Sequence, residues 1–361
     1  MWPTPQEFNE AIQRPDLCFE DPELKLATVS LNPLGLPRSI TGSFASVYKL
    51  RSGNAVHAVR CFLEDRAGLL TRYAIIEESL AAVGFEDFVR FRFIGRGIKD
   101  SGRWYPILKM DWCEGLPLDQ YLNKVVGDYS RLDSIQSQFR LLMKRLYERR
   151  IAHGDLQHGN ILIEGERMVL VDYDGMFVPR LSGSESVELG HRNFQHPRRN
   201  SSLFSGGLDN FSAHLIDTSL SILKEDPDLW SRFECGDDCL LFRHRDLRSP
   251  EKSALFAGLS SHESEEVRRH GAQLTRLLKV KPEAIPDLSA SSEELEEIFA
   301  DEENLICDRS EISLISDLGI GPDDLDDLAK RPRRARRHPR LKIPRSLLGR
   351  VAKLKENMHM R

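Results

Sequence analysis

The chain has 361 residues, of which 40% are hydrophobic and 30% are charged, so it can bury a substantial core. No stretch approaches the roughly 20 consecutive apolar residues of a membrane span, and the first residues lack the basic start and apolar run of a secretory signal. The net charge of −5 is small and conceals two strongly charged blocks near the C-terminus.

Six cysteines are scattered along the chain. This pattern favours a reducing cytoplasm over a disulfide framework. Cys235 and Cys239 form one CGDDC motif, but a zinc site requires a second pair of ligands, and no such pair stands out. The sequence therefore predicts a cytoplasmic protein in which this motif is an incidental spacing.

The first part of the chain has the patterns of a β-sheet with one helix. Residues 1–37 are polar and interrupted by prolines, and we expect a loosely packed lead-in. Alternating apolar residues predict strands within 39–62, 88–94 and 105–110. The stretch 69–83 is rich in Leu, Ala, Ile and Glu, which predicts a helix.

The later part of the chain is mostly helical in pattern. Four apolar residues at helical spacing predict a core helix that leads into the loop at 153. They are Ile135, Phe139, Leu142 and Leu146. Residues 205–285 are also mostly helical. A sheet-rich part followed by a helix-rich part predicts an α+β fold with two lobes, followed by a charged C-terminal extension.

Residues 153–175 carry the most informative pattern. Two apolar strand patterns flank the polar turn 164–167, which predicts a hairpin. If the hairpin is centred on Glu166, Asn160 lies opposite Asp172. Directly opposed residues have Cβ atoms about 4.5–5.5 Å apart, which is close enough to share a metal ion.

Asp155 lies in the loop just before this hairpin. A carboxylate that can accept a proton, beside a carboxylate–amide pair that can hold Mg²⁺, is the set of groups that phosphoryl transfer from Mg-ATP requires. HGDLQHGN, followed by Asp172-Tyr-Asp-Gly, resembles the catalytic loop and metal-binding turn of protein kinases. The resemblance implies that Asp155 orients a substrate hydroxyl, and that Asn160 and Asp172 hold Mg²⁺ on the phosphates of ATP.

Weaker parts of the kinase pattern precede this loop. The segment 40–47 keeps one glycine, Gly42, of the loop that covers the ATP phosphates in kinases. Arg60 stands where kinases have a lysine, and a guanidinium can also bind phosphate although it is longer and planar. The helix carboxylate implied as its partner is Glu77 or Glu78, which the sequence does not separate.

The segment 105–115 resembles the last strand and the hinge between the kinase lobes. The resemblance implies that backbone groups of Asp111 to Cys113 bind the adenine edge and that Met110 lies at the back of the pocket. The side chains of Asp111, Asp174 and Asp209 are expected to be structural.

The resemblance covers about residues 39–285, with departures. Gly154 stands where many kinases have arginine, and HGDLQHGN is closer to the aminoglycoside-type phosphotransferases. The segment 190–198 matches the substrate-docking loop of protein kinases, with Arg198 in place of a glutamate. Asp209 resembles the aspartate that binds the catalytic-loop backbone, and an ordinary helix N-cap is the alternative.

The strings HAVRCF, GHRNFQHPRR and LDNFSA together resemble a divergent bacterial serine/threonine protein-kinase-like group. The implied function is ATP- and Mg²⁺-dependent phosphorylation of a Ser or Thr hydroxyl in a protein substrate. A pseudokinase that acts as a nucleotide-binding scaffold is the first alternative, because of the thin glycine loop and Arg60. A small-molecule kinase is the second, and the segment 190–212 opposes it.

The predicted organisation has five parts: a lead-in (1–37), an N-lobe (38–110), a C-lobe (111–285), an acidic, partly helical segment (286–329) and a basic tail (330–361). The acidic segment holds 15 Asp and Glu against one Arg, and the basic tail holds 13 Lys and Arg against one Glu.

The acidic segment begins with a helix pattern that Ser292 caps, with Glu293–Glu297 following, and a second short pattern with a Gly-Pro break comes later. We expect the basic tail to contact an acidic partner, to fold back on the acidic segment, or to remain disordered. Non-specific nucleic-acid binding is less favoured because aromatic residues do not interleave with the charges, and no membrane contact is expected.

Overall fold

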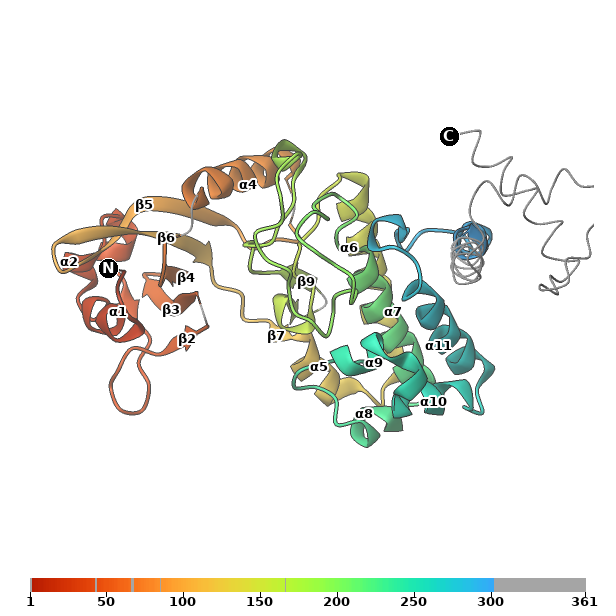
Figure 1. Ribbon diagram of the computed structural model, residues 1–361. Coiled ribbons are helices and arrows are strands. Elements are labelled where there is room, and N and C mark those ends of the chain that lie inside the picture. Colours follow the sequence, from red (N-terminus) through yellow and green to blue (C-terminus); the bar gives the residue numbers. More distant parts are fainter. Residues whose placement is uncertain (1, 43, 66–67, 85, 166, 302–361) are drawn as a thin grey trace, which may run out of the picture. The chain divides into compact units, whose positions relative to one another are not determined.

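The computed structural model describes residues 2–301 except 43, 66–67, 85 and 166 (Figure 1). The chain separates into two compact units, Met1–Ala290 and Ser291–Arg361. The second short pattern of the acidic segment and the whole basic tail lie outside the described residues.

The first unit begins with an antiparallel sheet whose strands differ in length. The strand order is β1-β3-β4-β6-β5, and β2 also pairs with β3. Its strands are β1 (Thr28–Val29), β2 (Ser39–Thr41), β3 (Ala45–Ser52), β4 (Ala55–Phe62), β5 (Phe91–Asp100) and β6 (Arg103–Asp111). Helix α4 (Leu69–Val83) connects β4 to β5, with the bounds that the sequence predicts. One sheet with one connecting helix is the N-lobe arrangement that the sequence patterns indicate.

The prediction of a loosely packed lead-in is wrong. Residues 1–37 contain three short helices, α1 (Pro5–Ala11), α2 (Pro15–Cys18) and α3 (Pro22–Lys25). Phe8 and Ile12 are fully buried in one cluster with Val59 of β4. These helices therefore complete the core on one face of the sheet. A signal was present in the sequence, because Thr4 and Glu7 form a capping box at the start of α1.

The later part of the first unit is helical, as expected. Its helices are α5 (Leu118–Val125), α6 (Tyr129–Glu148), α7 (Asn210–Glu225), α8 (Asp228–Arg232), α9 (His244–Arg248), α10 (Ala254–Ser260) and α11 (Glu265–Leu277), and α7 packs against both α6 and α11 (Figure 1). All four residues of the predicted stripe on α6 are buried, which confirms it as a core helix. The α+β, kinase-like order of elements predicted from the sequence is thus confirmed.

A small sheet contacts α5 and α6 and carries the hairpin. It consists of β7 (Leu116–Pro117), β8 (Ile161–Glu164) and β9 (Arg167–Leu170). Short 3₁₀ turns complete the unit at His158–Asn160, Pro179–Leu181, Pro250–Lys252 and Pro282–Ala284.

In the second unit, residues 292–301 form the expected acidic helix. Its cap is Ser291 and not Ser292. The Ser291 hydroxyl accepts a hydrogen bond from the N–H of Glu294, and the Glu294 carboxylate accepts one from the N–H of Ser291. The predicted start of the helix was therefore wrong by one residue.

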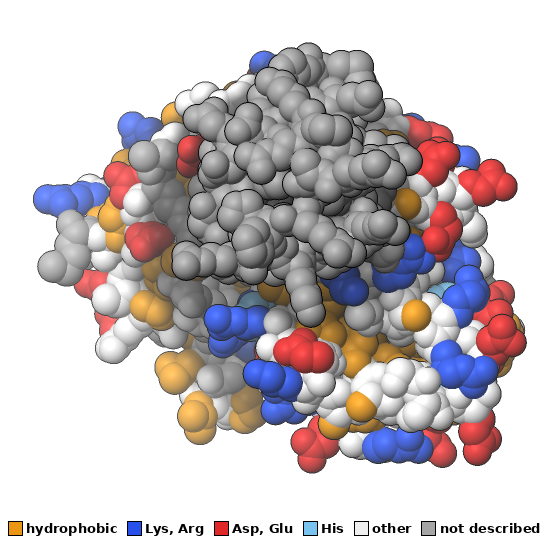
Figure 2. Space-filling view, turned by 45° about the vertical axis from the view of Figure 1, so that its right-hand side comes forward, with side chains coloured by type: hydrophobic (Ala, Val, Ile, Leu, Met, Phe, Trp, Pro, Cys, Tyr) orange, Lys and Arg blue, Asp and Glu red, His pale blue; other side chains and the backbone are white. Residues whose placement is uncertain are grey.

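Acidic and basic side chains are interspersed on the face shown in Figure 2, with apolar side chains between them. Within the described part of the chain, no helix is both long and apolar enough to cross a bilayer.

Candidate active site

The loop before the hairpin is held by a buried carboxylate from α7. Asp209 accepts hydrogen bonds from the backbone N–H groups of His153 and Gly154, the latter at 2.9 Å. Its side chain does not cap its own helix. The geometry expected from the kinase resemblance is therefore present, and the N-cap alternative is not. Burial raises the pKa of Asp209, and the neighbouring His153 and the two N–H groups oppose this effect only in part.

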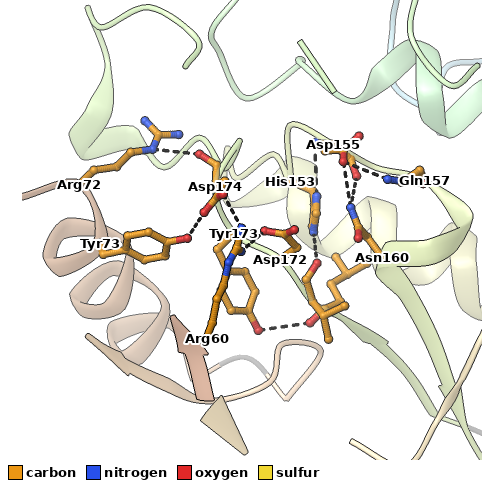
Figure 3. Close-up of polar contacts among 12 residues, drawn as sticks. Arg60, Arg72, Tyr73, His153, Asp155, Gln157, Asn160, Asp172, Tyr173 and Asp174 are labelled. Atoms are coloured by element: carbon orange, nitrogen blue, oxygen red, sulfur yellow. Dashed lines mark hydrogen bonds and ion pairs between the residues drawn. The ribbon is translucent and has the colours of Figure 1, made fainter. Parts of the chain in front are cut away.

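His153 ties this loop to the turn after the hairpin. Its Nε2 lies 2.8 Å from the carbonyl oxygen of Val171, and its Nδ1 lies 3.4 Å from the N–H of Asp155. A carbonyl oxygen can only accept, so these partners place the proton on Nε2. His153 thus connects the two stretches that carry Asp155 and Asp172 (Figure 3).

Asp155 and Asn160 are in direct contact. The Asn160 amide donates to the carbonyl oxygen of Asp155 at 2.9 Å and to its Oδ2 at 3.1 Å. Gln157 donates to the same Oδ2 at 3.1 Å, while Oδ1 accepts the backbone N–H of His191 at 2.6 Å. Both oxygens of the candidate catalytic carboxylate are therefore oriented by donors from its own loop and from the 190–198 segment.

The predicted register of the hairpin is wrong by one residue. Ile161 pairs with Leu170, and the N–H of Val171 donates to the carbonyl oxygen of Asn160 at 3.0 Å. Asn160 is therefore opposite Val171 and not Asp172. The turn is one residue shorter than a hairpin centred on Glu166 requires. Asp172 instead leaves the strand with a φ of +68°, an uncommon conformation for a residue other than glycine.

Arg60, on β4, binds both aspartates of the Asp-Tyr-Asp turn (Figure 3). Its Nη1 lies 2.5 Å from Oδ1 of Asp172, and its Nη2 lies 2.6 Å from Oδ2 of Asp174. The helix carboxylates implied as its partners lie elsewhere. Glu77 accepts the backbone N–H of Phe93 at 3.1 Å, and Glu78 pairs with Arg180 at 2.5 Å.

This pairing sets the charge of the group. Burial alone raises the pKa of Asp172, but the adjacent guanidinium outweighs it and holds the pKa below the usual range. Burial alone lowers the pKa of Arg60, but Asp172, Tyr73 and Asp174 outweigh it and raise the pKa. Arg60 and Asp172 are therefore both charged at neutral pH.

The remaining predicted residues belong to two places: the segment that resembles the hinge between the kinase lobes, and the glycine loop. Met110 and Asp111 end β6, and the N–H of Asp111 donates to the carbonyl oxygen of Arg90 at 2.9 Å. The N–H of Trp112 donates to Val56, also at 2.9 Å. Two of the three backbone N–H groups in the segment implied for adenine, those of Asp111 and Trp112, are thus engaged within the protein.

Gly42 lies between β2 and β3, as the kinase resemblance implies. A Cβ added there would meet nothing within 4 Å. Among the described residues, no contact therefore requires a glycine at 42, in contrast to Gly154, whose added Cβ would lie 2.0 Å from the carbonyl oxygen of Gly175.

Three residues of the site were missed by the sequence reasoning, whereas Asp174 was expected to be structural. Tyr73 donates its hydroxyl to Asp174, and Arg72 donates to the carbonyl oxygens of Asp174 and Met176 at 3.1 and 2.6 Å. Arg199 is buried and donates to the carbonyl oxygen of Gly154 at 2.9 Å. The available signal was the second aspartate of the Asp-Tyr-Asp turn, since two adjacent carboxylates need a cation.

Asn160 and Asp172 offer oxygen donors of the kind that Mg²⁺ prefers. Among the described residues, no group of three or more His, Cys, Asp or Glu is placed to hold a metal ion. A site with two protein ligands fits this finding, because Mg²⁺ on a nucleotide takes its other ligands from phosphates and water. The Asp172 side chain is 42% exposed, so a ligand can reach it.

No protein-family model matches the chain, and no curated protein matches it. Among solved structures, the Cydia pomonella granulovirus kinase PK-1 is similar, with 14% sequence identity and a TM-score of 0.47. The match covers 77% of this chain and 96% of that one. The order of the elements is that of an α+β fold in which a sheet-rich part precedes a helical part, and Asp209 holds the loop backbone as the resemblance noted in the sequence implies.

Proposed function

We propose that this chain is a Mg-ATP-dependent phosphotransferase that acts on Ser or Thr hydroxyls of a protein. The observation that carries the proposal is the connected set of contacts in the catalytic loop. Asp209 fixes the loop backbone, Asn160 orients Asp155, and His153 links both to the turn of Asp172. A structural loop has no need for this complete set.

Each group has a role in the proposed reaction. Asp155 accepts the proton of the substrate hydroxyl while the hydroxyl oxygen attacks the γ-phosphorus and the bond to ADP breaks. Asn160 and Asp172 would hold Mg²⁺, which neutralises charge on the phosphates. Arg60 lies beside Asp172, where its guanidinium can face the phosphates. Positioning and charge neutralisation supply most of the rate enhancement.

The segment 190–212 supports a protein as substrate. It contributes the His191 N–H on Asp155 and the Asp209 carboxylate under the loop. Arg198, where protein kinases have glutamate, donates to the carbonyl oxygen of Lys279 at 2.6 Å and also to that of Val280. In place of the ion pair that the resemblance implies, Arg198 thus contacts the residues just after α11, and the segment stays anchored. The resemblance to bacterial kinase-like proteins and the free cysteines support a cytoplasmic enzyme.

The first test is calorimetric binding of ATP to the full chain, with and without Mg²⁺. We expect Mg²⁺ to strengthen ATP binding to the wild type, and Asp172→Ala to abolish that dependence while the fold stays intact. Asp133→Ala is the matched control, because it removes an exposed carboxylate of a surface pair with Lys224. Equal ATP affinity in Asp172→Ala and wild type, with and without Mg²⁺, would refute the metal assignment.

A nucleotide-binding pseudokinase is the second candidate. Arg60 neutralises the metal aspartate, and the His191 N–H occupies one oxygen of Asp155. Transfer of labelled phosphate from ATP to a mixture of protein substrates separates the two functions. Transfer that is lost in Asp155→Asn supports the enzyme, whereas ATP binding without any transfer supports the scaffold.

A further inference from the structure

The two carboxylates that Arg60 binds differ in exposure. The Asp172 side chain is 42% exposed, whereas that of Asp174 is 6% exposed. Separating a buried ion pair is costly, because it leaves a charge without compensation in a region of low dielectric constant. Asp172 is therefore the carboxylate that can be shared with a ligand, and Asp174 is the lasting partner of Arg60.

The carboxylates of α4 bind other groups. Glu77 faces the backbone of β5 through the N–H of Phe93, and Glu78 faces Arg180 on the surface. Each has a partner, so neither is required to neutralise Arg60. The kinase resemblance implies that a glutamate of this helix pairs with Arg60, and neither Glu77 nor Glu78 does so.

Helix α4 contacts the Asp-Tyr-Asp turn through different residues. Tyr73 is fully buried, stacks on Phe93 with a ring distance of 5.7 Å, and donates its hydroxyl to Asp174. Arg72 donates to the carbonyl oxygen of Asp174 in the turn and to that of Met176 just after it. Burial raises the pKa of Tyr73 well above its usual range, so its hydroxyl remains a donor. Helix α4 is thus linked to Asp174 by the neutral hydroxyl of Tyr73 and by hydrogen bonds from Arg72 to the backbone (Figure 3).

Arginine at position 60 fits this arrangement better than lysine. A guanidinium presents several N–H groups in one rigid plane and can hold two carboxylates at once. A lysine ammonium is a single point of charge on a shorter reach. Arginine at position 60 and aspartate at position 174 therefore form one ion pair, in which the second arm of the guanidinium is used.

We propose that Asp174, and not a carboxylate of α4, is the positioning residue that holds Arg60 for the nucleotide phosphates, with Tyr73 and Arg72 coupling α4 to it. The inference rests on the proposed function, because it assigns Arg60 to the phosphates. It predicts that Asp172 exchanges Arg60 for Mg²⁺ when the nucleotide binds, while the Arg60–Asp174 pair persists.

The test compares two variants that make the same chemical change, Asp174→Asn and Glu77→Gln. Without the Asp174 charge, Arg60 is held by Asp172 alone and competes with Mg²⁺ there. We expect calorimetry on the full chain to show Mg-ATP affinity reduced roughly tenfold in Asp174→Asn, and changed less than about twofold in Glu77→Gln. Tyr73→Phe keeps the ion pair but removes one hydrogen bond, and should give a smaller loss in the same direction.

A compensating pair separates positioning from loss of folding. Arg60→Lys shortens the cation, so it should weaken Mg-ATP binding by itself. Adding Asp174→Glu lengthens the anion by one methylene and should restore part of the affinity. A merely structural role does not predict this recovery. Loss of affinity in Glu77→Gln equal to that in Asp174→Asn, or wild-type affinity in Asp174→Asn, would overturn the proposal.

Urea unfolding of single and double variants tests, without a nucleotide, which carboxylate pairs with Arg60. The effects of Arg60→Met and Asp174→Asn should be strongly non-additive, whereas those of Arg60→Met and Glu77→Gln should add. If wild-type protein binds no ATP, the proposed function fails. The unfolding cycle then tests the pairing alone, and additive effects of Arg60→Met and Asp174→Asn would overturn it.

Discussion

At the scale of single residues, the catalytic loop is shaped by close backbone packing. Gly154 has a φ of +83°, and a Cβ there would lie 2.0 Å from the carbonyl oxygen of Gly175. Many kinases have arginine at this position, and here no side chain fits. Arg199, 45 residues later, instead brings a buried guanidinium to the Gly154 carbonyl. The loop therefore takes its buried cation from a segment that lies later in the chain.

We predict that Gly154→Ala destabilises the protein by at least about 2 kcal/mol, because it adds a backbone clash to the cost of a left-handed conformation. Gly165→Ala is the control. Gly165 has a φ of +64°, and its added Cβ meets nothing within 4 Å. Gly165→Ala should therefore cost only the free energy of placing alanine in the left-handed conformation, about 1 kcal/mol. Urea unfolding measures both, and equal losses would show that the contact with Gly175 does not constrain the loop.

At the scale of elements, the N-terminal helices belong to the lobe that carries Arg60. The outer face of the sheet packs against them, and Val59 and Cys61 contribute to that core while Arg60 between them reaches the opposite face. Asp21 caps α3 and also accepts a hydrogen bond from Lys109 of β6 at 3.0 Å. Helices and sheet are therefore joined by both apolar and ionic contacts.

We predict that Phe8→Ala lowers the free energy of unfolding by about 3–5 kcal/mol, the range for truncating a fully buried aromatic side chain. A loosely packed lead-in would show almost no effect. Leu34→Ala serves as the control, because Leu34 lies in the same segment and is 83% exposed. It should change the free energy by less than about 0.5 kcal/mol in the same unfolding experiment.

The sequence predicted long elements well and short ones poorly, for physical reasons. Helix Leu69–Val83 has 15 residues rich in helix-forming types, and its bounds were right. The helices before residue 26 span four to seven residues, too few for a clear period, so only a cap revealed the first. The hairpin register failed because a turn one residue shorter shifts every cross-strand partner.

The site was predictable where a motif fixes positions along the chain, as for Asp155 in the loop just before the hairpin. Roles that depend on contacts across the fold were not. Asp174 and Glu77 are both carboxylates near the expected place, and only the packing of Tyr73 and Phe93 decides which one meets Arg60. Pairing between distant residues follows from tertiary structure and not from local pattern.

At the scale of the whole molecule, buried neutral histidines make stability depend on pH. His196 follows the 190–195 segment and is 4% exposed. Its Nε2 lies 3.3 Å from the carbonyl oxygen of Leu278, and its Nδ1 accepts the N–H of Arg198 at 3.1 Å. Burial, assisted by the charge of Arg198, lowers the pKa of His196 to about 4. His214 and His270 shift in the same direction for the same main reason.

The sign of the effect follows from proton binding. Between pH 6.5 and about 4 the unfolded chain protonates this histidine, while the folded chain keeps it neutral. The contribution of the neutral histidine to the free energy of unfolding is therefore fully present above pH 6.5. It falls as the pH decreases, by about 1.4 kcal/mol per pH unit for one such group. We predict that wild-type protein loses roughly 2 kcal/mol more than His196→Gln between pH 7 and 5, measured by urea unfolding at each pH. The glutamine variant retains hydrogen-bonding groups but cannot titrate in this range. If the free energy of unfolding depended on pH in the same way in the two proteins, protonation of His196 would not link the 190–198 segment to acid unfolding.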